Sequence, residues 1–246
     1  MGIFTSRRRL PGPRPPTETG VHGERPFWLW LPESDPPWPG MVILHGAGSC
    51  KENHGDFGRA CAAAGWAALA YDQRGHGEAT DEMAPGAVAD VGEMARFLAA
   101  RDGVDRARVC ARGSSMGGFM AIHGAGEDDG IAGVIAICPA GERQLLRGLS
   151  SGELEMRAGP QARAALEEWL TGRDLHTAVE RLAGRPFLLL HAEGDAQIPA
   201  QQSRELYERA GEPRKLIVVP GGHHRSVQHD AELQGVALRW LERALP

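Results

Sequence analysis

The sequence lacks the features that mark membrane-spanning, secreted and nucleic-acid-binding proteins. No stretch approaches the roughly 18 apolar residues of a membrane-spanning helix, and the N-terminus has no apolar core of a signal peptide. The net charge is −5 over 246 residues, and the basic residues are scattered apart from Arg7 to Arg9. Because nucleic-acid binding usually needs a basic patch, we expect a cytoplasmic protein with neither a membrane nor a nucleic acid as partner.

Cysteine is also scarce, and its spacing excludes the common metal motifs. The four cysteines are widely spaced without a Cys-x-x-Cys pair: Cys50, Cys61, Cys110 and Cys138. Cysteines of this kind are typical of reduced residues in a cytosolic protein. The adjacent His223 and His224 have no cysteine or carboxylate nearby at metal-ligand spacing. We therefore expect no metal site and no cofactor.

What the sequence does contain is an alternation of two apolar patterns. Short apolar runs predict strands at 41–44, 66–71, 108–114, 131–138, 187–191 and 216–219, of which those at 41–44 and 131–138 are expected to be buried. Segments of helical periodicity predict helices at 56–64, 87–101, 201–210 and 233–241. Strands that alternate with helices form a mostly parallel sheet with helices on both faces. The fold class is therefore α/β, and 27–31 is predicted to be an edge strand.

The length suits one domain with two irregular parts. Residues 1–24 combine four prolines with arginines and polar residues, which predicts a disordered or irregular tail. Residues 25–246 then form a single α/β domain. Between about 139 and 185 the alternation stops, and this insertion is much longer than the usual connection of 2–6 residues. Because it has helical patterns of its own, we expect a small helical cap over the site.

A Gly-x-Ser-x-Gly pentapeptide at 113–117 joins a predicted strand to a predicted helix. Gly113 and Gly117 leave room for a turn so tight that Ser115 adopts a strained backbone conformation. Ser115 would then stand exposed at a strand end, with the N–H of Met116 facing whatever it attacks. The alternatives are an ordinary helix-capping serine, or Ser114 in this role if the turn is shifted by one residue.

The order of several motifs along the chain carries a resemblance to a known family. Ser115, Asp195 and His224 each follow a predicted strand, as do the loops 45–48 and 72–77. In this order the chain resembles the α/β-hydrolase superfamily, and is most similar to small carboxylesterases of the feruloyl-esterase, dienelactone-hydrolase-like and monoglyceride-lipase types. It differs from dienelactone hydrolases proper, which have cysteine in place of Ser115. It also lacks the aspartate nucleophile of haloalkane dehalogenases and epoxide hydrolases.

The resemblance implies the α/β-hydrolase fold and a role for each of these residues. Ser115 would be the nucleophile, His224 the base that takes its proton, and Asp195 the acid that orients the imidazole. The backbone N–H groups of Ala47 and Met116 would form the oxyanion hole. The reaction would be hydrolysis of a small-molecule ester through an acyl-enzyme.

Two of these roles could be filled by a neighbouring residue. Glu193 lies on the same loop as Asp195, and His223 is adjacent to His224, although the pattern Gly-x-x-His fits His224 after Gly221. The substrate pocket is predicted to include four residues: His54, Leu146, Leu149 and Trp169. The apolar ones among them fit equally well in a small core of the cap.

Two functions from different classes fit the sequence. The first is a serine carboxylesterase for small or medium acyl or aryl esters, with thioester, acyl-peptide or perhydrolase chemistry as variants. The second is a ligand-binding homologue that keeps the scaffold with little or no turnover, because a fold does not guarantee a reaction. The sequence leaves the natural substrate and the oligomeric state open.

Overall fold

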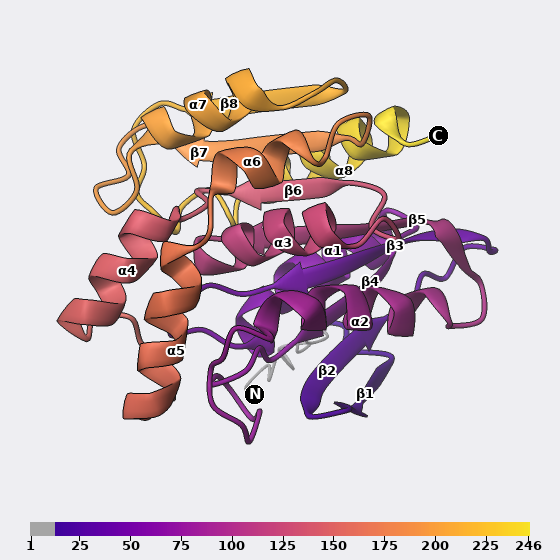
Figure 1. Ribbon diagram of the computed structural model, residues 1–246. Helices are drawn as coiled ribbons and strands as arrows, with labels where there is room; N and C mark the ends of the chain where they lie inside the picture. Colours follow the sequence, from indigo (N-terminus) through magenta and orange to yellow (C-terminus); the bar gives the residue numbers. More distant parts are fainter. Residues whose placement is uncertain (1–12) are drawn as a thin grey trace, which may run out of the picture.

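Eight strands form one sheet in the computed structural model, which describes residues 13–246 (Figure 1). The strands are β1 (Glu18–His22), β2 (Arg25–Trp30), β3 (Trp38–Leu44), β4 (Ala67–Tyr71), β5 (Val104–Ser114), β6 (Val134–Ile137), β7 (Phe187–Ala192) and β8 (Arg214–Val219). Their order across the sheet is β1-β2-β4-β3-β5-β6-β7-β8. β1 pairs antiparallel with β2, and β2 with β4, whereas the other neighbours are parallel. The predicted mostly parallel sheet is confirmed.

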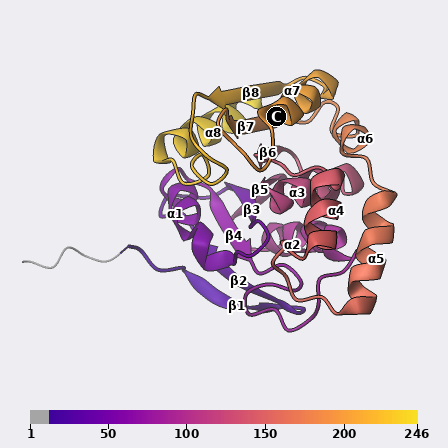
Figure 2. The ribbon, with the colours of Figure 1, turned by 90° about the vertical axis from the view of Figure 1, so that its left-hand side faces the viewer.

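Helices cover both faces of this sheet (Figure 2). One face carries α1 (Gly55–Ala63) and α8 (Ala231–Ala244), and the other carries α2 (Ala87–Ala99), α3 (Met116–Glu127) and α7 (Ala200–Arg209). β3 shows why its sequence is continuously apolar. Met41 and Ile43 pack toward α1 and α8, whereas Val42 and Leu44 pack toward α2 and α3. Because side chains alternate between faces and both faces are covered, every position of the strand after Trp38 is buried.

The N-terminal end of the sheet corrects two predictions. The edge strand is β1, not the strand at 27–31, because β2 is paired on both sides. Residues 18–22 were predicted to be part of an irregular tail, but they form this strand, whereas residues 1–12 lie outside the described part of the chain. β1 is almost entirely exposed and has no apolar alternation. It forms through backbone pairing with β2 across a turn at Gly23, whose φ is +57°, so its side chains carried no signal.

The segment from 139 to 185 contains three helices: α4 (Glu142–Ser151), α5 (Pro160–Thr171) and α6 (Leu175–Glu180). α4 and α5 pack against each other (Figures 1 and 2). α6 instead packs against α3 and α7, on the body of the domain. The amphipathic α4 buries Leu145 and Leu149 and leaves its other positions facing outward.

Candidate active site

The turn after β5 places Ser115 in a conformation that few residues adopt. Its φ of 54° and ψ of −120° lie outside the usual regions for a residue with a side chain. A Cβ on Gly117 would meet the carbonyl oxygens of Leu44 and His45 at 2.5 Å, and one on Gly113 would collide with the carbonyl of Gly117. The predicted steric role of both glycines is confirmed: the backbones approach so closely that no side chain fits.

Backbone bonds hold this turn from three sides. The N–H of Ser115 donates to the carbonyl of Ile137 at 2.9 Å, and its carbonyl accepts from Phe119 and Ala140, each at 3.1 Å. Ser115 is half-buried, whereas Ser114 is buried at the strand end. Of the two serines, Ser115 is the more exposed, and it forms the N-terminus of α3.

Asp195 and His224 form a hydrogen-bonded pair at the ends of β7 and β8. The Nδ1 of His224 lies 2.6 Å from the Oδ2 of Asp195, and Oδ1 accepts from the N–H groups of Gln197 and Ile198 at 2.8 and 3.0 Å. Burial on its own would raise the pKa of Asp195. The hydrogen bonds from His191, His224 and the backbone outweigh it and hold this pKa well below the usual range, so the carboxylate is ionised.

The neighbours of this pair have other partners. His223 is exposed, and its Nδ1 accepts from the N–H of Arg225 at 3.3 Å. Glu193 is likewise exposed, and it pairs with Arg204 at 2.9 Å. The histidine that meets a buried carboxylate is therefore His224.

Ser115 and His224 line the same cleft, which has a volume of about 1360 Å³. Ala47 also lines it. Met116 is the first residue of α3, and its side chain is buried under the cap. The cleft thus brings together residues from loops that follow β3, β5 and β8, at one edge of the sheet.

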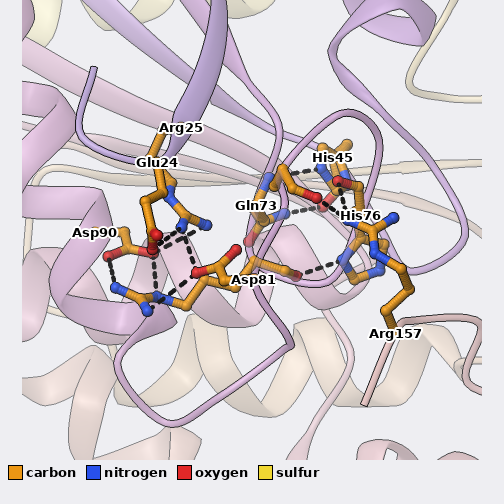
Figure 3. A network of polar contacts seen from close by, with 10 residues as sticks. Glu24, Arg25, His45, Gln73, His76, Asp81, Asp90 and Arg157 are labelled. Carbon is orange, nitrogen blue, oxygen red and sulfur yellow. Dashed lines mark hydrogen bonds and ion pairs between the residues drawn. The ribbon is translucent and has the colours of Figure 1, made fainter. Parts of the chain in front are cut away.

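The loop that contains Ala47 is fixed by a neutral histidine (Figure 3). The Nε2 of His45 accepts from the N–H of Gln73 at 3.0 Å, so its Nδ1 carries the proton and donates to the carbonyl of Gly46 at 2.8 Å. The side chain of Gln73 donates back to the His45 carbonyl at 2.6 Å. Burial lowers the pKa of His45 to about 4. This imidazole is therefore a neutral brace that orients the loop.

Charged residues hold the adjacent loop after β4. Arg74 binds both oxygens of Asp90 at 2.7 and 2.8 Å, and Arg25 contacts Asp90 and Asp81 (Figure 3). Lys51, one of only two lysines, is buried and binds Asp72 at 2.9 Å. Paired in this way, the buried charges keep the loop in one conformation.

The cap is attached to these loops by its segment 155–159. The N–H of Gly48 donates to the carbonyl of Glu155 at 2.8 Å, and the N–H of Arg157 donates to that of Gly75 at 2.8 Å. The guanidinium of Arg157 reaches carbonyl oxygens of the 76–79 loop, next to His76 (Figure 3). The cap chain thus contacts the loop that would stabilise an oxyanion.

The predicted pocket residues separate into two groups. His54 and Leu146 line the cleft, whereas Leu149 and Trp169 do not, as the alternative of a small core in the cap predicts. They line a small apolar cavity of about 20 Å³ beneath the cap, together with Met116, Met120 and other apolar residues. The reason is the helical period of α4, which turns Leu149 toward α5 and Leu146 toward the cleft.

Sequence reasoning missed several polar residues of the cleft wall. Asn53, Gln228 and His229 lie near His54 in this wall. Asn53 comes from the short helix η1 (Lys51–His54), and Gln228 and His229 come from the turns after β8, so only the tertiary structure brings them together. Arg112, which is buried and binds His54, was also missed.

One group of residues has the composition of a metal site. Potential ligand atoms of Cys138, His191 and Asp195 lie within 4.8 Å of one another. Both nitrogens of His191 already have partners, at 2.7 Å on Ser203 and 2.9 Å on the carbonyl of Ile198. Burial raises the pKa of the Cys138 thiol to about 12, so it is protonated. This donor set suits hydrogen bonding around Asp195 better than a metal ion.

These features define the class of the protein. The sheet order, the strained strand-to-helix turn and the placement of loops at the carboxyl ends of the strands show the α/β-hydrolase fold. Residues 36–151 match the family model described as serine aminopeptidase, S33. No helix within residues 13–246 has the length and apolar character to cross a bilayer.

Individual proteins resemble the chain in sequence or in fold. The uncharacterized protein YfhR of Escherichia coli O157:H7 is 29% identical over 157 residues, which are 63% of this chain and 51% of YfhR. The chain thus spans about half the length of this relative. Est1E from Butyrivibrio proteoclasticus, solved with ferulic acid bound, aligns with a TM-score of 0.70 and 20% identity over 89% of this chain and 93% of Est1E. A monoacylglycerol lipase from Paleococcus ferrophilus also gives 0.70, with 17% identity over 92% and 99%. At these identities the solved structures show the shared fold.

Proposed function

We propose that the protein is a serine hydrolase that cleaves carboxylic esters of small or medium acyl or aryl groups. The observation that carries this proposal is the 2.6 Å bond between His224 and the ionised Asp195, in a cleft that Ser115 also lines. A serine hydroxyl becomes a useful nucleophile only when a base takes its proton. This arrangement supplies the base and a group that orients it.

Each residue then has one step in the reaction. His224 takes the proton of Ser115 as its oxygen attacks the ester carbonyl, and Asp195 stabilises the imidazolium that forms. The protonated His224 gives the proton to the leaving alcohol, which departs and leaves an acyl group on Ser115. A water molecule, deprotonated by the same imidazole, attacks the acyl-enzyme and releases the acid.

The negative charge that develops on the carbonyl oxygen needs donors that are already in place. We assign this role to the backbone N–H groups of Ala47 and Met116. The neutral brace at His45 supports the loop of Ala47, and the start of α3 adds its helix dipole beside Met116. One such donor typically contributes about 3 kcal/mol to the stabilisation of the transition state.

The relatives support the same chemistry without fixing the substrate. Est1E holds ferulic acid, and the Paleococcus ferrophilus protein is a monoacylglycerol lipase. The cleft combines apolar residues of α4 with polar residues from η1 (Lys51–His54) and from the loop after β8. It therefore suits an ester that has both apolar and polar parts.

The test compares p-nitrophenyl esters from acetate to dodecanoate on the wild type, Ser115→Ala and Ser114→Ala. We expect turnover by the wild type, loss of at least about a thousandfold in kcat for Ser115→Ala, and a much smaller loss for Ser114→Ala. Mass spectrometry after treatment with a fluorophosphonate should locate one adduct, on Ser115. Absence of both turnover and adduct in the wild type would favour the ligand-binding alternative instead.

A further inference from the structure

A buried arginine lies behind the wall of the cleft. Arg112, three residues before Ser115 on β5, is fully buried, with its guanidinium 4.7 Å from the ring centre of Phe57. Its Nη1 lies 2.8 Å from Nδ1 of His54, and its Nη2 donates to the carbonyl of Gln228 at 3.0 Å. Burial lowers the pKa of Arg112 to about 10, so the side chain is still charged at neutral pH.

The usual reason for burying an arginine is an ion pair, but Arg112 has none within residues 13–246. The carboxylate of Asp56 is directed elsewhere, to His229 and Gln234, both at 2.9 Å. Burying an unpaired charge is costly. The buried guanidinium of Arg112 is therefore hydrogen-bonded to a neutral side chain, His54, where most buried arginines meet a carboxylate.

This contact fixes the protonation state of His54. A guanidinium can only donate hydrogen bonds, so Nδ1 of His54 must accept, and the proton of the neutral imidazole is on Nε2. Burial, followed by the charge of Arg112, holds the pKa of His54 well below its usual value. His54 is therefore a neutral imidazole in one tautomer, with Nε2–H as its remaining donor.

That donor has no partner within the described chain. His54 is 1% exposed, and its Nε2 is buried without a hydrogen bond, yet the residue lines the cleft that Ser115 and His224 share. A buried donor that stays unsatisfied costs about 1–3 kcal/mol, so such groups in native proteins usually meet an acceptor. In a cleft, that acceptor is a water molecule in the free protein or an atom of a bound ligand.

The composition of the cleft agrees with this placement. Asn53, Gln228 and His229 are near His54, whereas α4 and the segment after it contribute Leu146 and Leu154. One part of the cleft wall is thus polar and another is apolar, and His54 belongs to the polar part.

We propose that His54 is a specificity-determining residue whose Nε2–H donates to an ether, hydroxyl or carbonyl oxygen of the substrate, and that Arg112 is a positioning residue that holds His54 in the donating tautomer. The substrate class is then an oxygen-substituted ester rather than a plain alkyl ester. This inference rests on the proposed hydrolase function and deepens it.

The kinetic test uses pairs of esters in which one methylene is replaced by oxygen, such as p-nitrophenyl butanoate and methoxyacetate. The oxygen is moved stepwise along the acyl chain, and along the alcohol in a second series of acetate esters. We expect at least one position at which His54→Phe lowers the kcat/KM ratio of the oxygen ester to its all-carbon partner more than tenfold. His54→Gln, which keeps an N–H donor, should restore part of that ratio.

A spectroscopic test addresses Arg112 without turnover. In ¹H–¹⁵N spectra of the imidazoles, His54 of the wild type should remain protonated on Nε2 alone from pH 5.5 to 8.5. Arg112→Met should produce a mixture of tautomers or a titrating His54, and should reduce the same kinetic ratio, whereas Arg112→Lys should retain more of it. Because the wild-type spectrum alone can show a proton on Nδ1, the test does not depend on the variant folding.

The outcomes separate the inference from the proposed function. Ester turnover that needs Ser115 but shows the same loss for both members of every pair in His54→Phe would overturn the inference and leave the function intact. A proton on Nδ1 of wild-type His54 near pH 7 would also overturn it. Absence of turnover on every ester would instead remove the proposed function, with the tautomer measurement still valid.

Discussion

The two ends of the candidate site are held in different ways. At the nucleophile end, the loops after β3 and β5 pack backbone against backbone, and glycines at 113 and 117 allow the contact. At the acid–base end, the loops after β7 and β8 also meet through a backbone bond, from the N–H of Gly194 to the carbonyl of Gly221 at 2.8 Å. The imidazole of His224, however, is held by its bond to Asp195, whose other oxygen accepts from two backbone N–H groups. The difference teaches that the position of Ser115 is part of the fold itself, whereas the position of His224 depends on a local polar network.

The contrast extends to charge. The nucleophile end contains His45, which burial keeps neutral with a pKa lowered to about 4, and burial lowers the pKa of His123, further along α3, to about 4 as well. The acid–base end contains an ionised carboxylate. Substitutions and pH should therefore affect stability at the first end and catalysis at the second.

The largest effect on stability is expected from Gly117→Ala. The new methyl group would collide with the carbonyl groups of Leu44 and His45, and neither backbone can move without breaking the sheet. We expect a loss of more than about 4 kcal/mol in the free energy of unfolding, or failure to fold. Urea denaturation measures it. The matched control is Gly221→Ala, whose φ of +66° strains alanine by about 1–2 kcal/mol but which has open space. Equal losses of unfolding free energy in the two variants would contradict the special steric role of Gly117.

The next largest effect concerns the acid–base end. Asp195→Asn should lower kcat by about a hundredfold to ten-thousandfold, because it removes the charge that stabilises the imidazolium of His224. Its unfolding curve should remain cooperative. Glu193→Gln, two residues earlier on the same loop, is the control and should keep most of the activity. If Glu193→Gln is the inactive variant, the acid has been assigned to the wrong carboxylate.

Acid should destabilise the nucleophile end first. A histidine with a lowered pKa in the folded state binds its proton more readily when unfolded, so stability falls as pH drops from 6.5 toward 4. At pH 5, the loss should be about 2 kcal/mol each for His45 and His123. The pKa of Asp195 is lowered as well, but its contribution to stability is lost only as the pH falls below the usual range of an aspartate. Urea denaturation at pH 7 and 5 tests this, and His123→Phe should remove the part due to that residue.

The smallest effect on activity is expected from a change in the hydrogen bonds of His191, which contacts Asp195. Ser203 lies 2.7 Å from Nδ1 of His191, and the Nε2 of His191 faces Asp195 at 3.5 Å. Ser203→Ala should loosen this imidazole and lower kcat a few-fold, about 1 kcal/mol, with little change in KM. Ser226→Ala, in the more exposed loop beside His223, is the control. An unchanged kcat for Ser203→Ala would show that the polar network ends at Asp195.

Much of the fold was predictable because its signals are local. Several buried parallel strands contain an uninterrupted apolar run, as in 41–44, and the glycines around Ser115 reveal a tight turn. β1 was not predictable, because backbone pairing alone makes an exposed polar segment into a strand. The residues of the acid–base pair, and the bond by which Asp195 orients the imidazole, could be expected only from the order of motifs and the family resemblance, because 29 residues separate them.

The least predictable features depend on contacts between distant segments. The partner of Arg112 is 58 residues away in the sequence, and nothing local to either residue indicates the pairing. Leu149 and Trp169 had the right apolar character for a pocket, but whether they face the cleft or the cap interior depends on how α4 and α5 are rotated. Residue type limits the candidates, and helix orientation decides between them.

The attachment of the segment 155–159 to the loops after β3 and β4 has a consequence for how such a protein can diversify. Because Glu155 and Arg157 are fastened to Gly48 and Gly75, the chain between Ala140 and Glu155 is a loop with both ends pinned to the scaffold. A loop pinned at both ends can be exchanged as a cassette, since the closure entropy of such a loop grows only slowly with its length. New substrate ranges could thus arise by replacing α4 alone, while the machinery beneath it stays as it is.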